Sequence, residues 1–141
     1  MILLDTDHLS LLQWGGDLAG RIERRMSALG VANSFPTSII SYEEQMRGWI
    51  SVIASAKAIA DQIRMYSRLH AQLRFFSTLT IFDFSEKAAV EFQRLGKLKI
   101  RIGTMDLKIA SISLALGATL FTRNVQDFSK VPGLRIEGAT T

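Results

Sequence analysis

The sequence contains no cysteine and only two histidines, and these shortages exclude several kinds of site. Without cysteine the chain cannot build a disulfide framework, a cysteine-ligated zinc site or a thiolate nucleophile. His8 and His70 are too few for a histidine-rich metal site or a histidine relay. Any metal centre in this protein must therefore rely mainly on carboxylate and other oxygen ligands.

Long apolar runs are also missing. The longest nearly apolar segment, residues 112–121, is interrupted by Ser113, Gly117 and Thr119, and it is shorter than the roughly 20 residues that a membrane-spanning helix needs. The opening Met-Ile-Leu-Leu-Asp lacks the basic region and long apolar stretch of a signal peptide. We therefore expect a cytoplasmic protein without membrane segments.

The remaining composition is that of an ordinary globular protein. The chain has 141 residues, of which 48% are hydrophobic and 21% charged, which suits one domain with a sizeable core. Its net charge of +4 favours a polyanionic partner such as RNA or DNA, or an acidic protein. The sequence shows no linker, repeat or low-complexity stretch, so we expect a single domain over residues 1–141.

Apolar patterning predicts short strands that alternate with pairs of helices. The expected strands are residues 2–5, 31–40, 79–84, 118–122 and, after Pro132-Gly133, 134–137. The expected helices are residues 7–14, 18–30, 41–53, a long one up to about 76, 85–97 and 104–116. The helices 41–53, 85–97 and 104–116 are expected to open at Ser41, Ser85 and Thr104. This alternation predicts an α/β fold with helices on both faces of a parallel sheet of four to five strands.

Four acidic residues fall where strands end or where the neighbouring helices begin. Asp5 ends the first strand and Glu44 lies in the first turn after the second. Asp106 lies in the first turn of the helix before the fourth strand, and Asp127 follows that strand. Because ligands gather at the carboxyl ends of parallel strands, we expect all four acids to converge on one pocket.

Such a cluster of acids predicts a metal site. Converging carboxylates repel one another unless a cation neutralises them. Ligands that are all oxygen select Mg²⁺, with Mn²⁺ as a substitute. A metal of this kind activates water for in-line attack on a phosphodiester and stabilises the leaving oxygen. This chemistry needs no side-chain nucleophile, which fits a chain without cysteine.

Three of the acids also have structural explanations that remain open. Ser41 and Glu44 have the spacing of a capping box, in which Glu44 only satisfies its own helix start. Asn124 and Asp127 have the same spacing. Asp106 is favoured in a first helical turn whatever it binds, because of the helix dipole.

Asp5 is harder to explain structurally, because an acid after Ile-Leu-Leu in a buried strand needs a partner. Asp7 is interpreted as the cap of the first helix, or as a residue that reaches the metal through water. His8 is expected to face solvent in that turn. His70 lies on an apolar stripe with Ile59, Ile63, Tyr66 and Leu73 and is expected to be partly buried.

Basic residues precede Asp106 in the sequence. Lys97, Lys99 and Arg101 precede this acid and are candidates for holding a phosphate backbone near the metal. Trp49, in contrast, is interpreted as a core or interface residue rather than as a platform for base stacking.

Four segments of the sequence together resemble the motifs of PIN domains. Residues 1–7 are similar to their first strand with its metal-binding Asp, and Glu44 stands four residues before Gly48 as in their second motif. Asp106 opens an alanine-containing helix as in the third motif. Residues 121–134 resemble the closing segment of VapC-type toxins. The resemblance covers essentially the full chain.

This resemblance implies a PIN-like three-layer α/β/α sandwich and an endoribonuclease that depends on Mg²⁺ or Mn²⁺. The implied substrate is a transfer RNA or another structured RNA. A VapC-type toxin inhibits growth and is neutralised by a cognate VapB-type antitoxin. The family also implies a homodimer, for which residues 49–76 offer an interface.

The resemblance assigns residues as well. Asp5, Glu44 and Asp106 are the implied metal ligands. Many relatives carry a further acid where this chain has Asn124, so either Asp127 or Asn124 completes the acidic site. Two threonines are implied to position water or an acid: they are Thr104 and Thr122.

Two other functions remain as alternatives. One is a catalytically inactive PIN fold that binds RNA, although the retained acids argue against a decayed site. The other is a phosphatase of the haloacid-dehalogenase type, because Asp5-Thr6-Asp7 mimics its nucleophile motif. That family needs Thr or Val where Leu9 stands, and a paired acid where Asp106 has no acidic neighbour.

Overall fold

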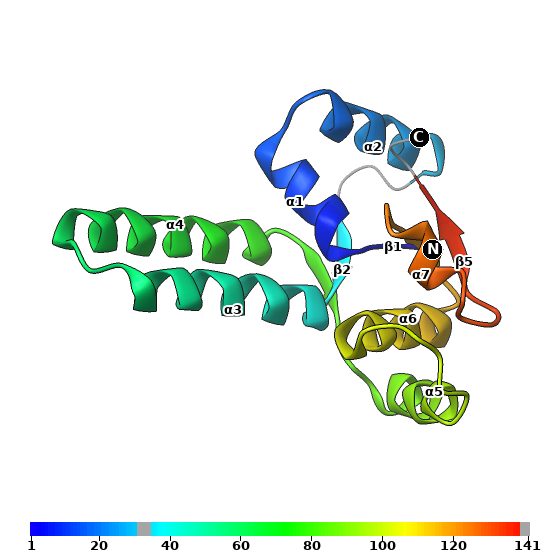
Figure 1. Ribbon diagram of the computed structural model, residues 1–141. Coiled ribbons are helices and arrows are strands. Elements are labelled where there is room, and N and C mark those ends of the chain that lie inside the picture. The colour runs from blue at the N-terminus through cyan, green and yellow to red at the C-terminus, as the bar shows by residue number, and fades with distance from the viewer. Residues whose placement is uncertain (31–34, 139–141) are drawn as a thin grey trace.

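The computed structural model of the protein describes residues 1–30 and 35–138, in which one five-stranded parallel sheet forms the centre (Figure 1). The strands are β1 (Ile2–Leu4), β2 (Pro36–Ser38), β3 (Thr80–Phe82), β4 (Thr119–Phe121) and β5 (Arg135–Glu137). Their order is β3-β2-β1-β4-β5, and every neighbouring pair is parallel. The predicted parallel sheet, including its fifth strand, is therefore confirmed.

Helices follow the strands along the chain. They are α1 (Thr6–Trp14), α2 (Asp17–Ala28), α3 (Ile39–Ser55), α4 (Ile59–Ser77), α5 (Glu86–Gly96), α6 (Thr104–Leu116) and the short α7 (Val125–Phe128). Figure 1 shows α1 and α2 on one side of the sheet, α5 and α6 on the other, and α3 and α4 projecting together as a hairpin. None of the helices in the described ranges has the length and apolar character that crossing a membrane requires.

The two faces of the sheet carry separate cores. Successive side chains of a strand point to opposite faces, and β1 follows this rule. Ile2 and Leu4 pack with Ile22, Met26 and Phe121 on the α1–α2 side. Leu3, between them in sequence, packs into the larger core formed with α5 and α6. These two cores confirm the three-layer α/β/α arrangement predicted from the sequence.

Strand β2 is shorter than predicted. Of the predicted strand 31–40, residues 31–34 lie outside the described residues, and Ile39 already begins α3. Pro36 is the first residue of the strand, a position that tolerates proline. The neighbouring Thr37 is buried, and its hydroxyl donates to the carbonyl oxygen of Leu4 in β1 at 3.0 Å.

Several predicted helix caps were wrong. Asp5, not Asp7, caps α1 by accepting a hydrogen bond from the backbone N–H of His8. Ser38, not Ser41, caps α3. Helix α6 begins after Gly103 without a side-chain cap, so Thr104 does not cap it. The cap at Ser85 is confirmed, since its hydroxyl accepts from the Ala88 N–H.

The α3–α4 hairpin carries exposed apolar side chains. Ile59, Ile63, Tyr66 and Leu73 of the predicted stripe are each more than half exposed. His70 on the same stripe is exposed too, which contradicts the partial burial expected for it. The stripe is therefore an uncovered face of this chain rather than part of its core.

Candidate metal and active site

A small polar pocket lies where β1, β2 and β4 end and the helices that follow begin. Its volume is about 220 Å³. The residues that line it are Asp5, Thr6, Asp7, Glu44, Asp106, Asn124 and Phe128. The structure therefore brings Asp5, Glu44 and Asp106 to one site, although about a hundred residues separate the first from the last. We call this site the acidic pocket.

Asp5 is buried and serves the fold as well as the pocket. It is 5% exposed. Its Oδ1 accepts from the backbone N–H of His8 at 2.9 Å and lies 3.2 Å from His8 Nδ1. Both contacts use the same oxygen, so Oδ2 takes no part in them. Asp5 is therefore held in place at the start of α1 while its carboxylate lines the acidic pocket.

His8 is fully buried, so the expectation that it faces solvent was wrong. Its ring meets Phe121 of β4 edge to face, with ring centroids 6.3 Å apart. Nδ1 faces Asp5, and Nε2 is buried with no hydrogen-bond partner among the described residues. The ring thus contacts both the carboxylate of Asp5 and the ring of Phe121 in β4.

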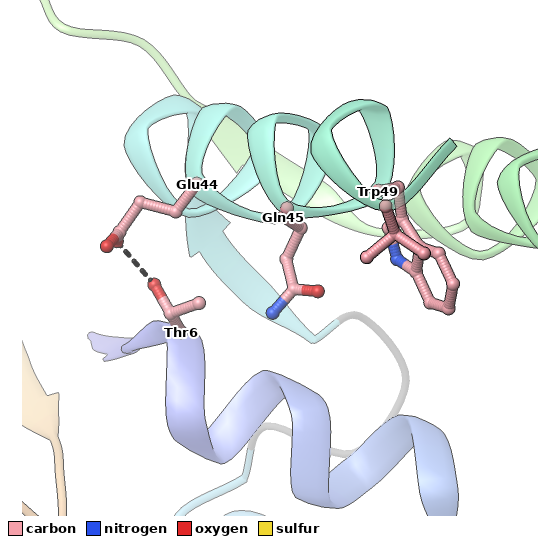
Figure 2. Close-up of a pocket in the computed structure, with 6 residues that line it drawn as sticks. Thr6, Glu44, Gln45 and Trp49 are labelled. Atoms are coloured by element: carbon pink, nitrogen blue, oxygen red, sulfur yellow. Dashed lines mark hydrogen bonds between the residues drawn. The ribbon is translucent and has the colours of Figure 1, made fainter. Parts of the chain in front are cut away.

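Glu44 reaches across to α1 rather than back to its own helix start. Its Oε1 accepts a 2.8 Å hydrogen bond from the hydroxyl of Thr6 (Figure 2). The Thr6 oxygen also lies 3.1 Å from Ser41 Oγ. The capping-box interpretation of Glu44 is wrong, because Ser38 occupies the cap of α3 and accepts from the Ser41 N–H at 3.2 Å.

Asp106 shows how much negative charge gathers in the acidic pocket. Its pKa is raised from the ordinary 3.8 to about 6, first by burial and then by the charges of Glu44, Asp5, Asp127 and Asp7 in that order. A carboxyl group in such surroundings is stabilised when a cation binds beside it.

Asn124 is among the residues that line the acidic pocket, whereas Asp127 is not. Asn124 Nδ2 donates to Asp127 Oδ2 at 3.1 Å. Lys130 Nζ contacts the other oxygen of Asp127 at 3.3 Å. The hydrogen bond from Asn124 and then the one from Lys130 lower the pKa of Asp127. The neutral amide of Asn124 thus lines the acidic pocket, and the carboxylate of Asp127 holds that amide in place.

Neither of the two predicted threonines lines the acidic pocket. Thr104 is exposed. Thr122 is fully buried, and its hydroxyl accepts from the Asn124 N–H at 2.9 Å, so it holds the backbone at the start of α7. The predicted basic residues Lys97, Lys99 and Arg101 are exposed, and the carbonyl oxygen of Arg101 accepts from Lys130 at 3.0 Å.

Sequence reasoning missed Thr6 and His8 as parts of the site. Both lie in the first turn of α1, directly after Asp5. A buried acid at the end of a strand needs hydrogen-bond donors, and polar residues one and three positions later are natural sources of them. That signal was present in the sequence.

Comparison with known proteins covers this chain at two levels. No family model matches it. In sequence it is 39% identical over 67 residues to Ribonuclease VapC2 of Rickettsia felis, a match that covers 45% of this chain and 50% of that protein. The chain therefore matches about half the length of the curated relatives.

In structure the likeness extends over the whole chain. A chain of the VapBC2 complex from Rickettsia felis, bound to a promoter DNA fragment, aligns with a TM-score of 0.70 and 28% identity over 97% of this chain and 98% of that one. A chain of VapBC-1 from nontypeable Haemophilus influenzae aligns with a TM-score of 0.74 and 25% identity over the full length of both. The fold of this chain is therefore similar to that of chains in VapBC complexes. This agrees with the resemblance seen in the sequence.

The donor groups of the acidic pocket suit a hard cation. The acidic pocket offers carboxylate oxygens from Asp5, Asp7, Glu44 and Asp106 and an amide from Asn124, but no sulfur. As the side chains stand, no three His, Asp or Glu residues in the described ranges are close enough together to hold an ion. To hold an ion, the carboxylates of the acidic pocket would have to lie closer together than they do in this structure.

Proposed function

We propose that this protein is a metal-dependent endoribonuclease that hydrolyses RNA phosphodiester bonds and acts as the toxin of a toxin–antitoxin pair. The observation that carries this proposal is the acidic pocket, which Asp5, Glu44 and Asp106 line together although they lie far apart in the sequence. The curated relative from Rickettsia felis is named a ribonuclease, and the solved neighbours are VapBC complexes, which supports the same activity here.

The metal that fits best is Mg²⁺, with Mn²⁺ as a substitute. Asp5, Glu44 and Asp106 would hold it, with Asp7 and Asn124 at the edge of the pocket. When bound, the ion supplies an activated water and neutralises charge on the oxygens of the scissile phosphate.

The residues of the chain itself fix the geometry of that site. His8 and the start of α1 hold Asp5 in one orientation. Thr6 holds Glu44 against α1. Asp127 acts through Asn124, which fills the fourth place in the pocket with a neutral amide, so Asp127 is a positioning residue in this proposal.

The proposed substrate is a transfer RNA or another structured RNA. The exposed residues Lys97, Lys99 and Arg101, between α5 and α6, would contact its phosphate backbone. The proposed protein partners are a VapB-type antitoxin and a second copy of this chain. The exposed apolar side chains of the α3–α4 hairpin support a homodimer, because a contiguous apolar surface of this kind marks an interaction site.

Induced expression in a bacterial host tests the function. We expect expression of the wild-type chain to arrest growth and to generate new RNA ends at defined positions, which sequencing of RNA 5′ ends would detect. Asp5→Asn should remove both effects. Asp17→Asn is the matched control, because Asp17 is an exposed acid at the start of α2, away from the pocket. New RNA ends that persist unchanged in Asp5→Asn would contradict the assignment of the site.

A further inference from the structure

A second pocket adjoins the acidic pocket, and nothing in the proposed chemistry uses it. Its volume is about 430 Å³. The residues that line it are Thr6, Glu44, Gln45, Gly48, Trp49 and Val52. It shares Thr6 and Glu44 with the acidic pocket, so the two pockets lie on either side of these residues. Figure 2 shows this side pocket between α1 and α3, with the Glu44–Thr6 hydrogen bond at one end and Trp49 at the other.

Gly48 is a residue that the fold itself does not explain. It lies inside α3, where glycine stabilises a helix less than alanine does. Its backbone is not in the left-handed region, and a Cβ added to it would meet nothing within 4 Å. It lies one turn after Glu44 on the same side of the helix. The space beside Gly48 is therefore open to something that approaches α3 next to Glu44.

The chemistry of the side pocket suits a flat group with apolar faces and a polar edge. Trp49 and Val52 supply apolar surface. The amide of Gln45 lies between Glu44 and Trp49 in Figure 2, and its nitrogen is tied to Ser10 Oγ at 2.9 Å. That hydrogen bond fixes the amide and leaves its oxygen to accept from a ligand.

The side pocket also lies at a useful distance from the acidic site. Trp49 follows Glu44 by five residues, which is about 7.5 Å along a helix axis. A base joined through its ribose to a phosphate in the acidic pocket can therefore reach the indole. Bases stack on aromatic side chains whatever their sequence, because every base has a π face.

We infer that the side pocket binds one nucleobase of the RNA, beside the nucleotide whose phosphate enters the acidic pocket. The base stacks on Trp49, its edge meets the amide of Gln45, and its sugar passes over Gly48. This inference rests on the proposed ribonuclease function and adds to it the residues that select and position the substrate. It also replaces the interpretation of Trp49 as only a core or interface residue.

Tryptophan fluorescence tests the stacking directly. The chain has two tryptophans, so Trp14→Phe leaves Trp49 as the only one. In a Trp14→Phe, Asp106→Asn protein, which should not cleave, we would titrate a four-nucleotide oligoadenylate and the same ribose-phosphate chain without bases. We expect the oligoadenylate to quench Trp49 and to bind about tenfold tighter or more. Equal affinity of the two probes, or unchanged Trp49 emission, would overturn the inference.

Gly48→Ala tests the open space next to Glu44, and Gly96→Ala is its matched control. Gly96 also lies in a helix, α5, with nothing within 4 Å of an added Cβ. Both substitutions should raise the melting temperature. Only Gly48→Ala should weaken oligoadenylate binding about tenfold and raise KM for RNA cleavage more than it lowers kcat. Equal behaviour of the two variants toward RNA would contradict the inference.

The outcomes separate this inference from the function on which it rests. If the protein cleaves RNA but Gly48→Ala and Gly96→Ala behave alike, the proposed function stands and the base pocket is wrong. If oligoadenylate quenches Trp49 but the protein cuts no RNA, the base pocket stands and the proposed nuclease function is wrong. If Gly48→Ala weakens only the complex with a coexpressed antitoxin, the pocket holds a protein side chain and the inference is wrong.

Discussion

Among single residues, Asp106 shows most clearly how the gathering of acids in one pocket raises the pKa of a carboxyl group. Its pKa lies at about 6 in the folded chain against an ordinary 3.8. Above about pH 6 its charge is present in both the folded and the unfolded state, and the folded state carries the full destabilisation. As the pH falls from 6 towards 4, the folded state binds a proton that the unfolded state does not, so stability rises.

Asp106→Asn should therefore stabilise the metal-free protein at pH 7.5. Asp106 is partly exposed, so solvent screening reduces the expected gain in the free energy of unfolding to about 1 kcal/mol. The variant should also lose the part of the stability that wild type gains between pH 6 and pH 4. Urea unfolding in the presence of a chelator measures both effects. A variant less stable than wild type at pH 7.5 would show that Asp106 is not under charge strain.

His8 supports Asp5 from behind, and its removal should affect both stability and metal binding. His8→Ala deletes a fully buried ring, which should lower the free energy of unfolding by about 2–4 kcal/mol. Loss of the contact to Asp5 Oδ1 should weaken Mn²⁺ binding about 10- to 100-fold.

Calorimetric titration with Mn²⁺, below the unfolding temperature of both proteins, separates these two effects. His70→Ala is the control, because His70 is the only other histidine and is exposed on α4. We expect His8→Asn to recover part of the metal affinity through its side-chain amide. Unchanged Mn²⁺ affinity in folded His8→Ala would reduce His8 to a packing residue.

Between elements, α1 and α3 are joined by polar side chains that sequence patterns do not reveal. Thr6 donates to Glu44, and Gln45 donates to Ser10. These pairs are 38 and 35 residues apart in the sequence. They fix the orientation of α3, and with it the position of Glu44 at the pocket.

Thr6→Val keeps the shape of the side chain and removes the hydroxyl that holds Glu44. We expect kcat for RNA cleavage to fall about 10- to 100-fold, in line with the loss of one hydrogen bond to a charged group at about 1.5–3 kcal/mol. Thr6→Ser should restore most of it. Single-turnover cleavage rates at saturating Mg²⁺ measure the change. Equal rates for Thr6→Val and Thr6→Ser would mean that the bond does not orient Glu44.

The elements were predictable from the sequence, but their starting points were less so. Only Asp5 separates β1 from α1, so the acid that follows the strand is also the cap of the helix. β2 passes directly into α3 in the same way, which moves the cap from Ser41 to Ser38. Helical periodicity identifies the face of a helix, but the residue that turns into it depends on the strand before it.

Convergence of the acids was predictable, whereas the details of the pocket were not. Topology alone brings Asp5, Glu44 and Asp106 together, because parallel strands end at one edge. The choice between Asn124 and Asp127 depends on a local hydrogen bond and on Lys130. The burial of His8 depends on Phe121, which is distant in sequence.

At the scale of the whole molecule, the α3–α4 hairpin carries apolar side chains that no other part of the described structure covers. A stripe of apolar residues in the sequence indicates a buried face without indicating which chain buries it. Ile63 and Tyr66 are 66% and 57% exposed. The proposed homodimer would cover them.

Ile63→Glu should therefore convert the proposed dimer into a monomer. A charged side chain at the centre of an apolar interface loses solvation without a partner, and we expect the dissociation constant to rise at least about 100-fold. Sedimentation velocity of the isolated protein measures this. Glu23→Gln, an exposed change on α2, is the control. A dimer that survives Ile63→Glu would place the interface elsewhere on the molecule.

The most direct test of the central claim is cleavage of RNA by the purified protein as Mg²⁺ is varied. With a mixture of end-labelled transfer RNAs as substrate, we expect cleavage at defined positions that rises with Mg²⁺ and stops when a chelator is added. Asp106→Asn, folded and at least as stable as wild type, should be at least about 100-fold slower. Cleavage that continues in the chelator, or at an unchanged rate in Asp106→Asn, would contradict a metal-dependent ribonuclease centred on the acidic pocket.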